Sequence, residues 1–398
     1  MALDEKQAAS TRITSIDVVR GLVMVLMAID HVRVYSGQPA GGPTPGIFFT
    51  RWVTHFVAPA FVFFAGTGAY LHGAKLMDRG KLAKFLVSRG LWLVVLELTF
   101  LRFAWTFNFD YAHYSLAGVI WMLGWCMVIL AGIIYLPMSV IATFGIVTII
   151  AHPVLYSVLH APQGSFLDAL FQVLYLNGGF SIVGADGPPM LVLFVIIPWI
   201  GVMAAGYAFG PVMQWDPARR RAFCLRLGVG ATALFVALRA LDGFGDPRHW
   251  HDQITKGWPP LLAFLNTSKY PASFLFLLMT LGPTITLLPF VESAHGWLAQ
   301  KLETFGRVPL FYYILHIPLI HLAAVAVSLI RTGAVSPWLF ANHPVNPGPQ
   351  PAGYMWGLPL LYFVWAIVVV ILYFPCRWYA ALKARNKNTR LGTYLSYL

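Results

Sequence analysis

Apolar stretches of bilayer length recur along the whole chain, with polar, Gly-rich and Pro-rich segments between them. A window of about 20 residues, the length that crosses a bilayer as a helix, finds ten of them. Their approximate ranges are 15–35, 52–73, 86–105, 116–136, 138–159, 190–210, 223–241, 271–291, 307–330 and 356–376. The pattern predicts an all-α, polytopic integral membrane protein with about ten transmembrane helices.

Basic residues fall in alternate loops of this predicted topology. They are Lys6, Arg12, Lys75, Arg79, Lys81, Lys84, Arg89, Arg219, Arg220, Arg221, Arg226, Arg377, Lys383, Arg385, Lys387 and Arg390. The positive-inside bias makes that side cytoplasmic, and ten spans place both termini there. We therefore expect a cytoplasmic tail at 1–14, a single transmembrane domain at 15–376 and a basic cytoplasmic tail at 377–398.

The opposite, outer loops are longer and rich in Gly and Pro. They cover residues 36–51, 160–189, 242–270 and 331–355. Loops longer than about 15 residues usually serve a function or are disordered. Within the second of them, 166–176 is apolar enough to lie in the membrane interface or to re-enter the bilayer.

Composition supports a membrane protein and excludes a soluble one. The chain of 398 residues is 58% hydrophobic and 11% charged, whereas soluble domains carry about 25% charged residues. The net charge of +12 follows the loop pattern of the positive-inside bias, which argues against nucleic-acid binding. Cys126, Cys224 and Cys376 lie in or at apolar spans and predict no disulfide framework. No small-residue cleavage site follows the first apolar run, so we expect a retained span.

The first span is the most polar of the ten. Its helical stripe of i, i+3 and i+4 steps comprises Asp17, Arg20, Met24, Met27 and His31. Ionisable residues in a membrane face protein, so this stripe should point into the bundle. At about 1.5 Å rise per residue, Arg20 and His31 lie roughly 16 Å apart, one near each end of the hydrocarbon region.

His31 is the first candidate catalytic residue. An imidazole near the outer end of a span can abstract a proton near neutral pH or carry an acyl group. A buried histidine that only bonds to a neighbouring helix is the structural alternative. Asp30 lies about 100° round the helix, where it either orients another group or is a hydrated interfacial residue.

Two further histidines are expected on the outer side. His55 opens the second span and could face His31 after the short Gly/Pro-rich loop, and His113 follows the third span. Three imidazoles can in principle bind zinc, but no paired i, i+4 spacing is present, so we expect no metal site.

The third span carries Glu97 and Arg102, about 140° apart round the helix. An unpaired charge in a membrane costs several kcal/mol. Arg102 is therefore predicted to face Asp17, Asp30 or a bound anion, and Glu97 to face Arg20 or another cation. A purely structural interhelix pair is the alternative.

The ninth span begins with Arg307 at the predicted cytoplasmic mouth and carries His316 near mid-membrane. Arg307, Arg20 and Arg89 could together bind a phosphate that enters from the cytosol, although ordinary positive-inside anchoring also explains Arg307. His316 and His321 are five residues apart, so at most one faces any given site.

Before the eighth span, the outer segment GWPPLLAFLNTSKYP combines Trp258, Asn266, Lys269 and Tyr270. Aromatic faces with amide and ammonium donors suit sugar recognition. Interfacial aromatic belts contain the same residue types, so both interpretations stay open.

The run SIDVVRG, followed eleven residues after Arg20 by His31, resembles the first-helix signature of the transmembrane acyltransferases. Further segments, among them DHVRVYSG, FLNTSKYPASFLFLLMTLGP and GRVPLFYYILHIPLIH, resemble the bacterial branch of the heparan-alpha-glucosaminide N-acetyltransferase catalytic (DUF1624) family. The resemblance implies transfer of an acetyl group from cytosolic acetyl-CoA across the membrane to an amino or hydroxyl group of a sugar on the far side.

One feature of that family does not carry over. In the animal branch the catalytic histidine lies in the loop between the first two spans, and an acidic residue takes the place of His55. The corresponding loop here, SGQPAGGPTPGIFFTRW, contains no histidine. We therefore keep His31 as the catalytic candidate, from the broader acyltransferase pattern.

The sequence thus predicts a membrane acyltransferase that uses acetyl-CoA and a sugar or glycan acceptor. His31 would act as base or acyl carrier, oriented by Asp30 or His55. A proton-coupled transporter of a small anion or sugar is the alternative, and the absence of visible inverted repeats counts against it. A membrane scaffold would carry these intramembrane charges without purpose. We expect a bacterial inner membrane, and the sequence leaves open whether two copies form a homodimer.

Overall fold

The computed structural model describes residues 13–181, 187–294, 296–386, 389–395 and 397. Nearly all of the predicted N-terminal tail, with Lys6 and Arg12, lies outside these residues, as does Lys387 of the C-terminal tail.

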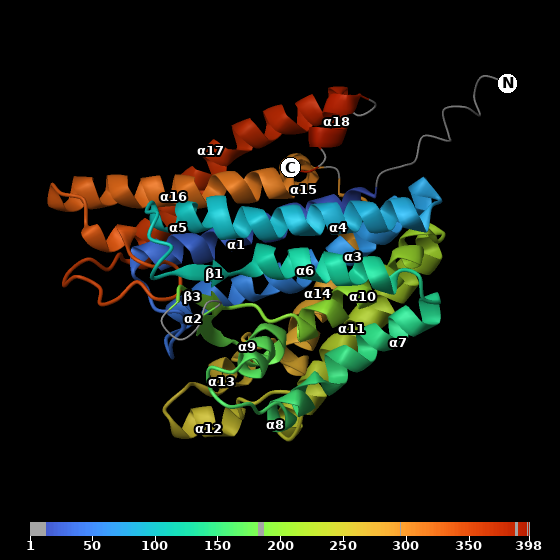
Figure 1. Cartoon of the computed structure of the whole chain (residues 1–398), viewed down its shortest axis with the longest axis horizontal. Coiled ribbons are helices and arrows are strands. Elements are labelled where there is room, and N and C mark those ends of the chain that lie inside the picture. Colours follow the sequence, from blue (N-terminus) through green and yellow to red (C-terminus); the bar gives the residue numbers. More distant parts are fainter. Residues whose placement is uncertain (1–12, 182–186, 295, 387–388, 396, 398) are drawn as a thin grey trace.

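The described chain is a bundle of helices that lie mostly along its long axis (Figure 1). The helices are α1 (Thr14–Ser36), α2 (Pro45–Trp52), α3 (Val57–Leu76), α4 (Arg79–Leu96), α5 (Arg102–Thr106), α6 (Val119–Ile133), α7 (Met138–Ala151), α8 (Leu155–Val158), α9 (Phe166–Phe171), α10 (Ile197–Phe209), α11 (Pro217–Leu241), α12 (Trp250–Thr255), α13 (Pro260–Leu265), α14 (Phe274–Val291), α15 (Trp297–Arg307), α16 (Pro309–Thr332), α17 (Leu358–Arg385) and α18 (Arg390–Leu395). A 3-10 turn (Val53–Phe56) joins α2 to α3, and a π-helical turn (Glu97–Leu101) joins α4 to α5.

Each of the ten predicted spans contains a helix, so the predicted helical membrane fold is confirmed in its class. Six helices of the described chain are long and apolar enough to cross a membrane. They are Pro45–Leu76, Met138–Val158, Pro217–Leu241, Phe274–Val291, Pro309–Thr332 and Leu358–Arg385. Helix α1 is not among them, because a candidate span needs an 18-residue window with at most two charged residues. Every such window of α1 includes at least three of its four charged residues. The number of ten spans and the cytoplasmic placement of the termini stay predictions.

A small sheet at one end of the bundle was not predicted. It has the order β1-β3-β2, with β1 (Ser115–Ala117) parallel to β3 (Pro189–Val192) and β2 (Gly178–Ser181) antiparallel to it. Strand β3 occupies the start of the predicted sixth span, and α10 begins only at Ile197. The sheet ties two loops together beside the start of α6.

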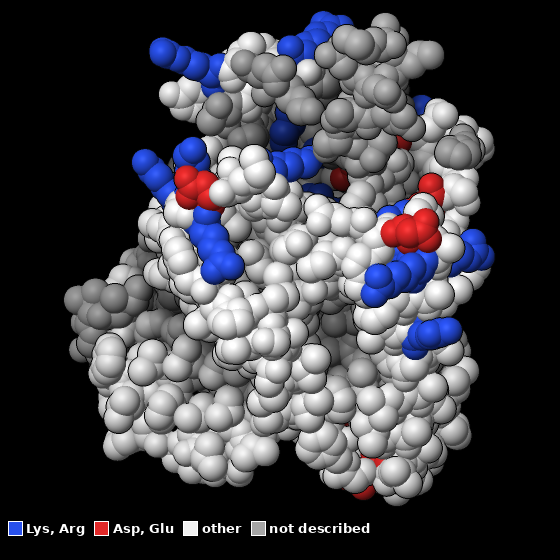
Figure 2. All heavy atoms as spheres, turned by 90° about the vertical axis from the view of Figure 1, so that its right-hand side faces the viewer, with Lys and Arg blue, Asp and Glu red and all other residues white. Residues whose placement is uncertain are grey.

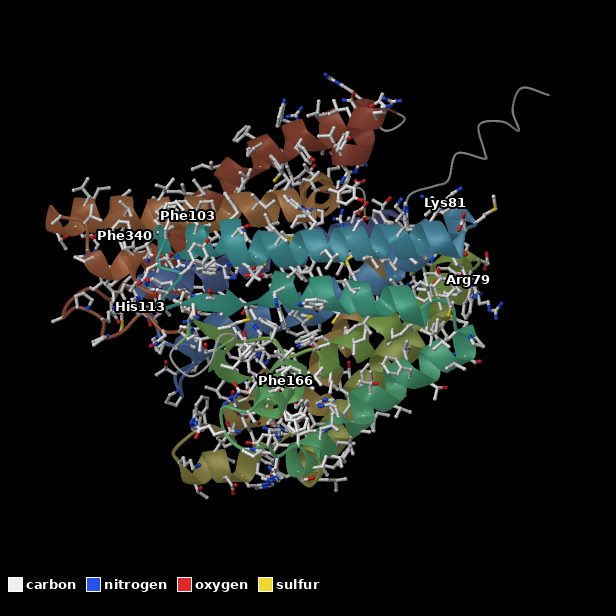
Figure 3. The ribbon with its side chains drawn as sticks, viewed as in Figure 1. Arg79, Lys81, Phe103, His113, Phe166 and Phe340 are labelled. Atoms are coloured by element: carbon white, nitrogen blue, oxygen red, sulfur yellow. The ribbon has the colours of Figure 1, made fainter. Side chains whose placement is uncertain are left out.

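Basic side chains gather at one end of the bundle (Figure 2). Figure 3 labels Arg79 and Lys81 at one end and His113 and Phe340 at the other. Viewed from the first end, the surface carries many Lys and Arg side chains and few acidic ones (Figure 2). This asymmetry is what the positive-inside pattern of the sequence predicts. We call the end with Arg79 and Lys81 the basic end. The end with His113 and Phe340, which the sequence predicts to face outward, is called the outer end.

Glycines let several helix pairs approach closely, most tightly where α1 meets α15. A Cβ built on Gly21 would lie 1.8 Å from the carbonyl oxygen of Leu302, and one on Gly306 would lie 1.8 Å from that of Asp17. Small residues at helix contacts are typical of membrane bundles, where close backbone approach replaces the hydrophobic drive. The sequence analysis had placed α15 in a polar loop, so this contact was missed.

The Gly21 contact generates a stability prediction. Gly21→Ala should lower the free energy of unfolding by about 1–3 kcal/mol, because the new methyl group forces the α1 and α15 backbones apart. Gly230→Ala in α11 is the matched control, since a Cβ there meets nothing within 4 Å. Thermal unfolding in detergent measures both. Equal melting temperatures for the two variants would contradict the close contact.

Candidate active site

Helix α1 lies inside the bundle and supplies the polar stripe of the candidate site. It packs against α3, α14, α15, α16 and α17. Asp17 and Met24 are buried, whereas Arg20 and His31 are half-buried and line cavities. The predicted inward orientation of the stripe is therefore found in the fold.

The larger cavity, of about 550 Å³, lies around the outer half of α1. Its wall includes Asp30, His31, Glu97, Lys269 and Tyr313. The outer loop between α16 and α17 forms a further side of the wall, with residues 343–345, 347, 348 and 350. With Arg51 of α2 and His343 of that loop, the cavity joins ionisable side chains from six separate parts of the chain.

A second cavity, of about 320 Å³, lies around the inner half of α1. Arg20 of α1 and Arg89 of α4 line it together with His72 of α3. Most of the remaining wall is apolar, with Met24 and Phe61 among its members. It is thus a mostly apolar space with two guanidinium groups in its wall.

The two cavities abut in the middle of the bundle. Five residues line both of them, namely Met27, Val57, Ala58, Val119 and Tyr313. Along the stripe of α1, Arg20 lines the inner cavity, Met27 lines both cavities and His31 lines the outer one. Together they extend from the arginines of the inner half to the histidine of the outer half.

His31 is paired with His316 of α16. The His31 Nδ1 lies 2.6 Å from the His316 Nε2, and the His316 Nδ1 lies 2.7 Å from the carbonyl oxygen of Tyr313. A carbonyl only accepts, so the His316 Nδ1 carries a proton and, in neutral His316, the Nε2 is the acceptor. His31 then donates from Nδ1, which leaves its Nε2 with a free lone pair. Such a tautomer is the one a general base needs.

Aromatic rings hold this pair in place. Trp105 meets the His31 ring edge-on with centroids 4.8 Å apart, and the Tyr312 ring stacks on His316 at 5.3 Å. One helical turn further along α1, Tyr35 stacks on His321 at 4.6 Å. As expected from their spacing, His316 and His321 lie in different places. His316 contacts His31, whereas His321 stacks on Tyr35 and Phe107.

The expected partners of His31 were wrong. Asp30 does not orient His31 but forms ion pairs with Arg33 at 2.7 Å and Arg51 at 3.6 Å. His55 lines a separate small pocket at the outer end, so it is not the residue that pairs with His31. The sequence missed His316 in this role because the spacing along one helix does not say which other helix approaches it.

Glu97 and Arg102 also find other partners than predicted. The Glu97 carboxylate accepts from the backbone N–H groups of Ile120 (2.8 Å) and Trp121 (3.2 Å) at the start of α6, not from Arg20. A helix N-terminus is favourable for an anion because its first N–H groups are unpaired and its dipole is positive there. Glu97 therefore ties the π-helical turn to α6 and lines the outer cavity.

Arg102 faces neither Asp17 nor Asp30. Its guanidinium donates to the backbone carbonyls of Asn108, Asp110 and Tyr114. It also donates to the side chains of Thr106 and Asn108. Through these hydrogen bonds, Arg102 stabilises the loop between α5 and β1.

The remaining predicted site residues divide between the two ends. The Arg20 guanidinium lies 3.8 Å from the Asp17 carboxylate, measured from nitrogen to oxygen. Arg20 also lines the inner cavity, together with Arg89. Arg307 is paired with Glu303 on α15, is half-exposed and is not part of the inner cavity wall, so its predicted role beside Arg20 is not supported. Lys269 is buried in the outer cavity wall, with its Nζ 5.3 Å from the centre of the Tyr270 ring.

His113 is exposed at the outer end and bonds to Asp110 at 2.7 Å. This hydrogen bond lowers the pKa of the Asp110 carboxyl. Within the described residues, no group of three or more His, Cys, Asp or Glu side chains is arranged to hold a metal ion.

Tyr313 and Arg51 are among the cavity residues that the sequence analysis did not single out. Tyr313 lines both cavities and supplies the carbonyl that fixes the tautomer of His316. Its i−3 spacing from His316 places it on the same helix face, a signal that could have found it. Arg51 lies in the short helix α2, within the predicted outer loop 36–51, where the sequence shows no helical pattern.

Membrane-length helices around two abutting internal cavities define a multi-pass membrane protein. The family model described as heparan-alpha-glucosaminide N-acetyltransferase, catalytic, matches residues 12–237. This match covers more than half of the chain, which therefore belongs to that family. The family indicates a membrane acetyltransferase. A search of the curated proteins finds no match.

The contact of Glu97 with α6 can be tested by stability. Glu97→Ala should lower the free energy of unfolding by about 1–3 kcal/mol, because two buried N–H groups lose their acceptor. Glu97→Gln keeps one acceptor oxygen of similar shape and should cost less. Thermal unfolding of the two variants in detergent is the measurement, and an equal loss for both would show that the hydrogen bonds to Ile120 and Trp121 are not what stabilises this position.

Proposed function

We propose that the protein is a transmembrane acyltransferase. It takes an acetyl group from acetyl-CoA at the basic, cytoplasmic end and passes it to an amino or hydroxyl group of a sugar or glycan at the outer end. The membrane that fits the proposal is a bacterial inner membrane, with the lipid bilayer around the bundle. The family match supports the class of reaction, and the cavities support its direction.

The observation that carries the proposal is the meeting of the two cavities along α1. Arg20 and Arg89 suit the phosphates of coenzyme A, because guanidinium groups bind phosphate strongly. The mostly apolar wall beyond them suits the thin pantetheine arm of coenzyme A. The shared residues, with Met27 and Tyr313 among them, then lie where an acyl group would reach the outer cavity.

His31 is the base of the proposed reaction. Its free Nε2 lone pair takes the proton from the acceptor amine or hydroxyl as the new bond to the acyl carbon forms. The C–S bond of the thioester breaks, coenzyme A leaves as the thiolate, and the proton taken up by His31 then passes to that sulfur. The charge that develops on the imidazole is shared through its Nδ1–H with His316, whose own Nδ1–H is held by Tyr313. The same lone pair would serve if His31 carried the acyl group transiently.

Activity measurements with purified protein in proteoliposomes test this function. Wild type should transfer label from radiolabelled acetyl-CoA to amino sugars, and His31→Ala should reduce the rate by about 10²–10⁴-fold, the usual contribution of a positioned base. His316→Ala should reduce kcat and also alter the pH profile, since His31 loses the acceptor that fixes its tautomer. The exposed His160→Ala is the control and should behave as wild type.

Transfer that persists in folded His31→Ala would remove His31 from the mechanism. If wild type neither transfers nor hydrolyses acetyl-CoA but sealed vesicles accumulate a sugar or small anion, the protein is the proton-coupled transporter instead.

A further inference from the structure

Among the described residues, one side chain at the meeting of the two cavities can donate a hydrogen bond. The residues that line both cavities are Met27, Val57, Ala58, Val119 and Tyr313. The first four carry apolar side chains without a donor, whereas Tyr313 carries a phenolic hydroxyl. Any group that passes from the inner cavity to the outer one therefore passes this tyrosine.

The Tyr313 hydroxyl is unpaired and accessible. The residue is 6% exposed, and within the described chain its side-chain oxygen makes no hydrogen bond. The neighbouring Tyr312 hydroxyl also lacks a partner, but that oxygen has almost no accessible surface. The Tyr313 oxygen is not closed off in this way, so it faces the cavity space that its residue lines. Buried hydroxyls are nearly always hydrogen-bonded, so an open donor in a cavity wall indicates a ligand that accepts from it.

The histidine pair holds the ring of Tyr313 at the candidate site. The ring meets that of His31 edge-on, with centroids 6.3 Å apart, and that of His316 with centroids 5.0 Å apart. The backbone carbonyl of Tyr313 accepts from the His316 Nδ1 at 2.7 Å. Tyr313 thus lies beside the proposed base, and its hydroxyl is left for another partner.

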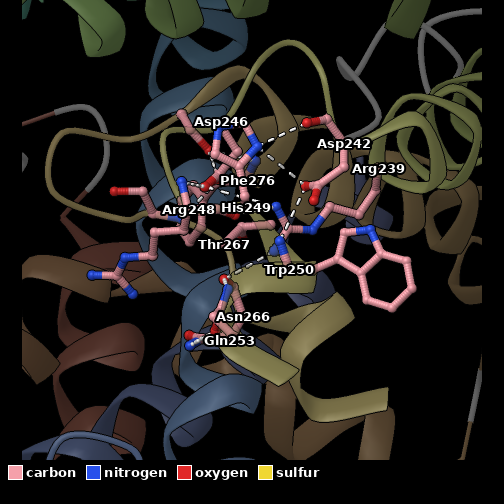
Figure 4. A network of polar contacts seen from close by, with 12 residues as sticks. Arg239, Asp242, Asp246, Arg248, His249, Trp250, Gln253, Asn266, Thr267 and Phe276 are labelled. Atoms are coloured by element: carbon pink, nitrogen blue, oxygen red, sulfur yellow. Dashed lines mark hydrogen bonds and ion pairs between the residues drawn. The ribbon is translucent and has the colours of Figure 1, made fainter. Parts of the chain in front are cut away.

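Lys269 is the alternative donor in the outer cavity. It is 8% exposed and lines the outer cavity but not the inner one. The residue before it is fixed by a polar network around Asp246 (Figure 4). The Asp246 carboxylate accepts from the backbone N–H of Ser268 at 2.8 Å and lies 3.9 Å from the Arg239 guanidinium. The backbone at Lys269 is therefore held at the outer wall, and Lys269 does not line the meeting of the two cavities.

We propose that the Tyr313 hydroxyl is a catalytic group, which donates a hydrogen bond to the acyl carbonyl oxygen while that oxygen carries negative charge. Attack on a thioester carbon moves the carbonyl electron pair onto oxygen, and a positioned donor stabilises that charge more than it stabilises the neutral ground state. The meeting of the cavities is where the acyl carbon reaches an acceptor beside His31. This inference rests on the proposed acyl transfer.

The proposed step conserves atoms and charge. The acceptor nitrogen or oxygen bonds to the acyl carbon, while His31 takes the acceptor proton and the carbonyl oxygen becomes an oxyanion. The oxyanion then restores the C=O bond, the C–S bond breaks, and the coenzyme A thiolate takes the proton from His31. Tyr313 keeps its own proton throughout and only donates a hydrogen bond.

The kinetics of Tyr313→Phe in proteoliposomes test this role. The variant keeps the ring, its contacts with His31 and His316 and the backbone carbonyl, and it removes only the hydroxyl. For acetyl transfer to an amino sugar, kcat should fall about 10²–10³-fold, the usual cost of removing one oxyanion donor. The KM for acetyl-CoA and the shape of the pH profile should stay as in wild type, because ground-state binding and the titration of His31 are unchanged.

Tyr70→Phe is the matched control, because Tyr70 of α3 lines neither cavity and its ring meets that of Tyr207. It removes the same atom and should transfer acetyl at the wild-type rate. If Tyr313→Phe keeps the wild-type kcat, the hydroxyl is not a donor in the reaction. A fall in kcat together with a shifted pH profile would make Tyr313 a proton carrier and would also overturn the donor role.

Infrared spectroscopy in detergent tests the hydrogen bond without turnover. His31→Ala should hold acetyl-CoA unreacted, and the difference between ordinary and isotope-labelled acetyl groups isolates the carbonyl stretch. A hydrogen bond weakens the C=O bond, so this band should lie at lower wavenumber than in free acetyl-CoA. Adding Tyr313→Phe should remove the shift, whereas adding Lys269→Met should leave it. Loss of the shift with Lys269→Met and not with Tyr313→Phe overturns the assignment to Tyr313.

The outcomes separate the two proposals. If wild type neither transfers nor hydrolyses acetyl-CoA, and His31→Ala shows only the carbonyl band of free acetyl-CoA, the proposed function fails. If wild type and Tyr313→Phe transfer acetyl alike, the acyl transfer stands and the role of Tyr313 fails.

Discussion

A polar helix kept away from lipid is the constraint on which the rest of this structure depends. Helix α1 carries charges at both ends, and charged side chains in a membrane are tolerated only when they face protein and find partners. Asp17 lies near Arg20, Asp30 pairs with two arginines, and His31 bonds to His316. Helix α1 packs against four long helices (α3, α14, α16 and α17) and the shorter α15, and Gly21 and Gly306 let α15 reach its backbone. The cavities lie along the polar stripe that this enclosure protects.

Periodicity was sufficient to predict the parts of the site that lie on one helix. The stripe of α1, the inward direction of Arg20 and His31 and the helical class all follow from i, i+3 and i+4 spacing and from apolar length. What spacing cannot give is the neighbour of each residue in space. His316 lies 285 positions away from His31, and no pattern along the chain joins the two.

The errors at Glu97 and Arg102 share one physical origin. The sequence analysis looked for side chains of opposite charge, yet the first N–H groups of α6 and the carbonyls of a loop satisfy these ions as well. Backbone partners have no sequence signature, so they are invisible until the fold is known. Helix α15 and strand β2 were missed because they lie between predicted spans, and strands β1 and β3 because they overlap the starts of two predicted spans.

Two cavities that abut inside a membrane protein have a consequence for the cell as well as for chemistry. A membrane that stores energy as a proton gradient must not let water or ions pass, so a space reaching from either side has to remain interrupted between them. Here five residues line both cavities, Met27, Val119 and Tyr313 among them, and four of the five are apolar. In the proposed reaction, the same residues therefore have to admit a small neutral acyl group and still insulate the two faces electrically.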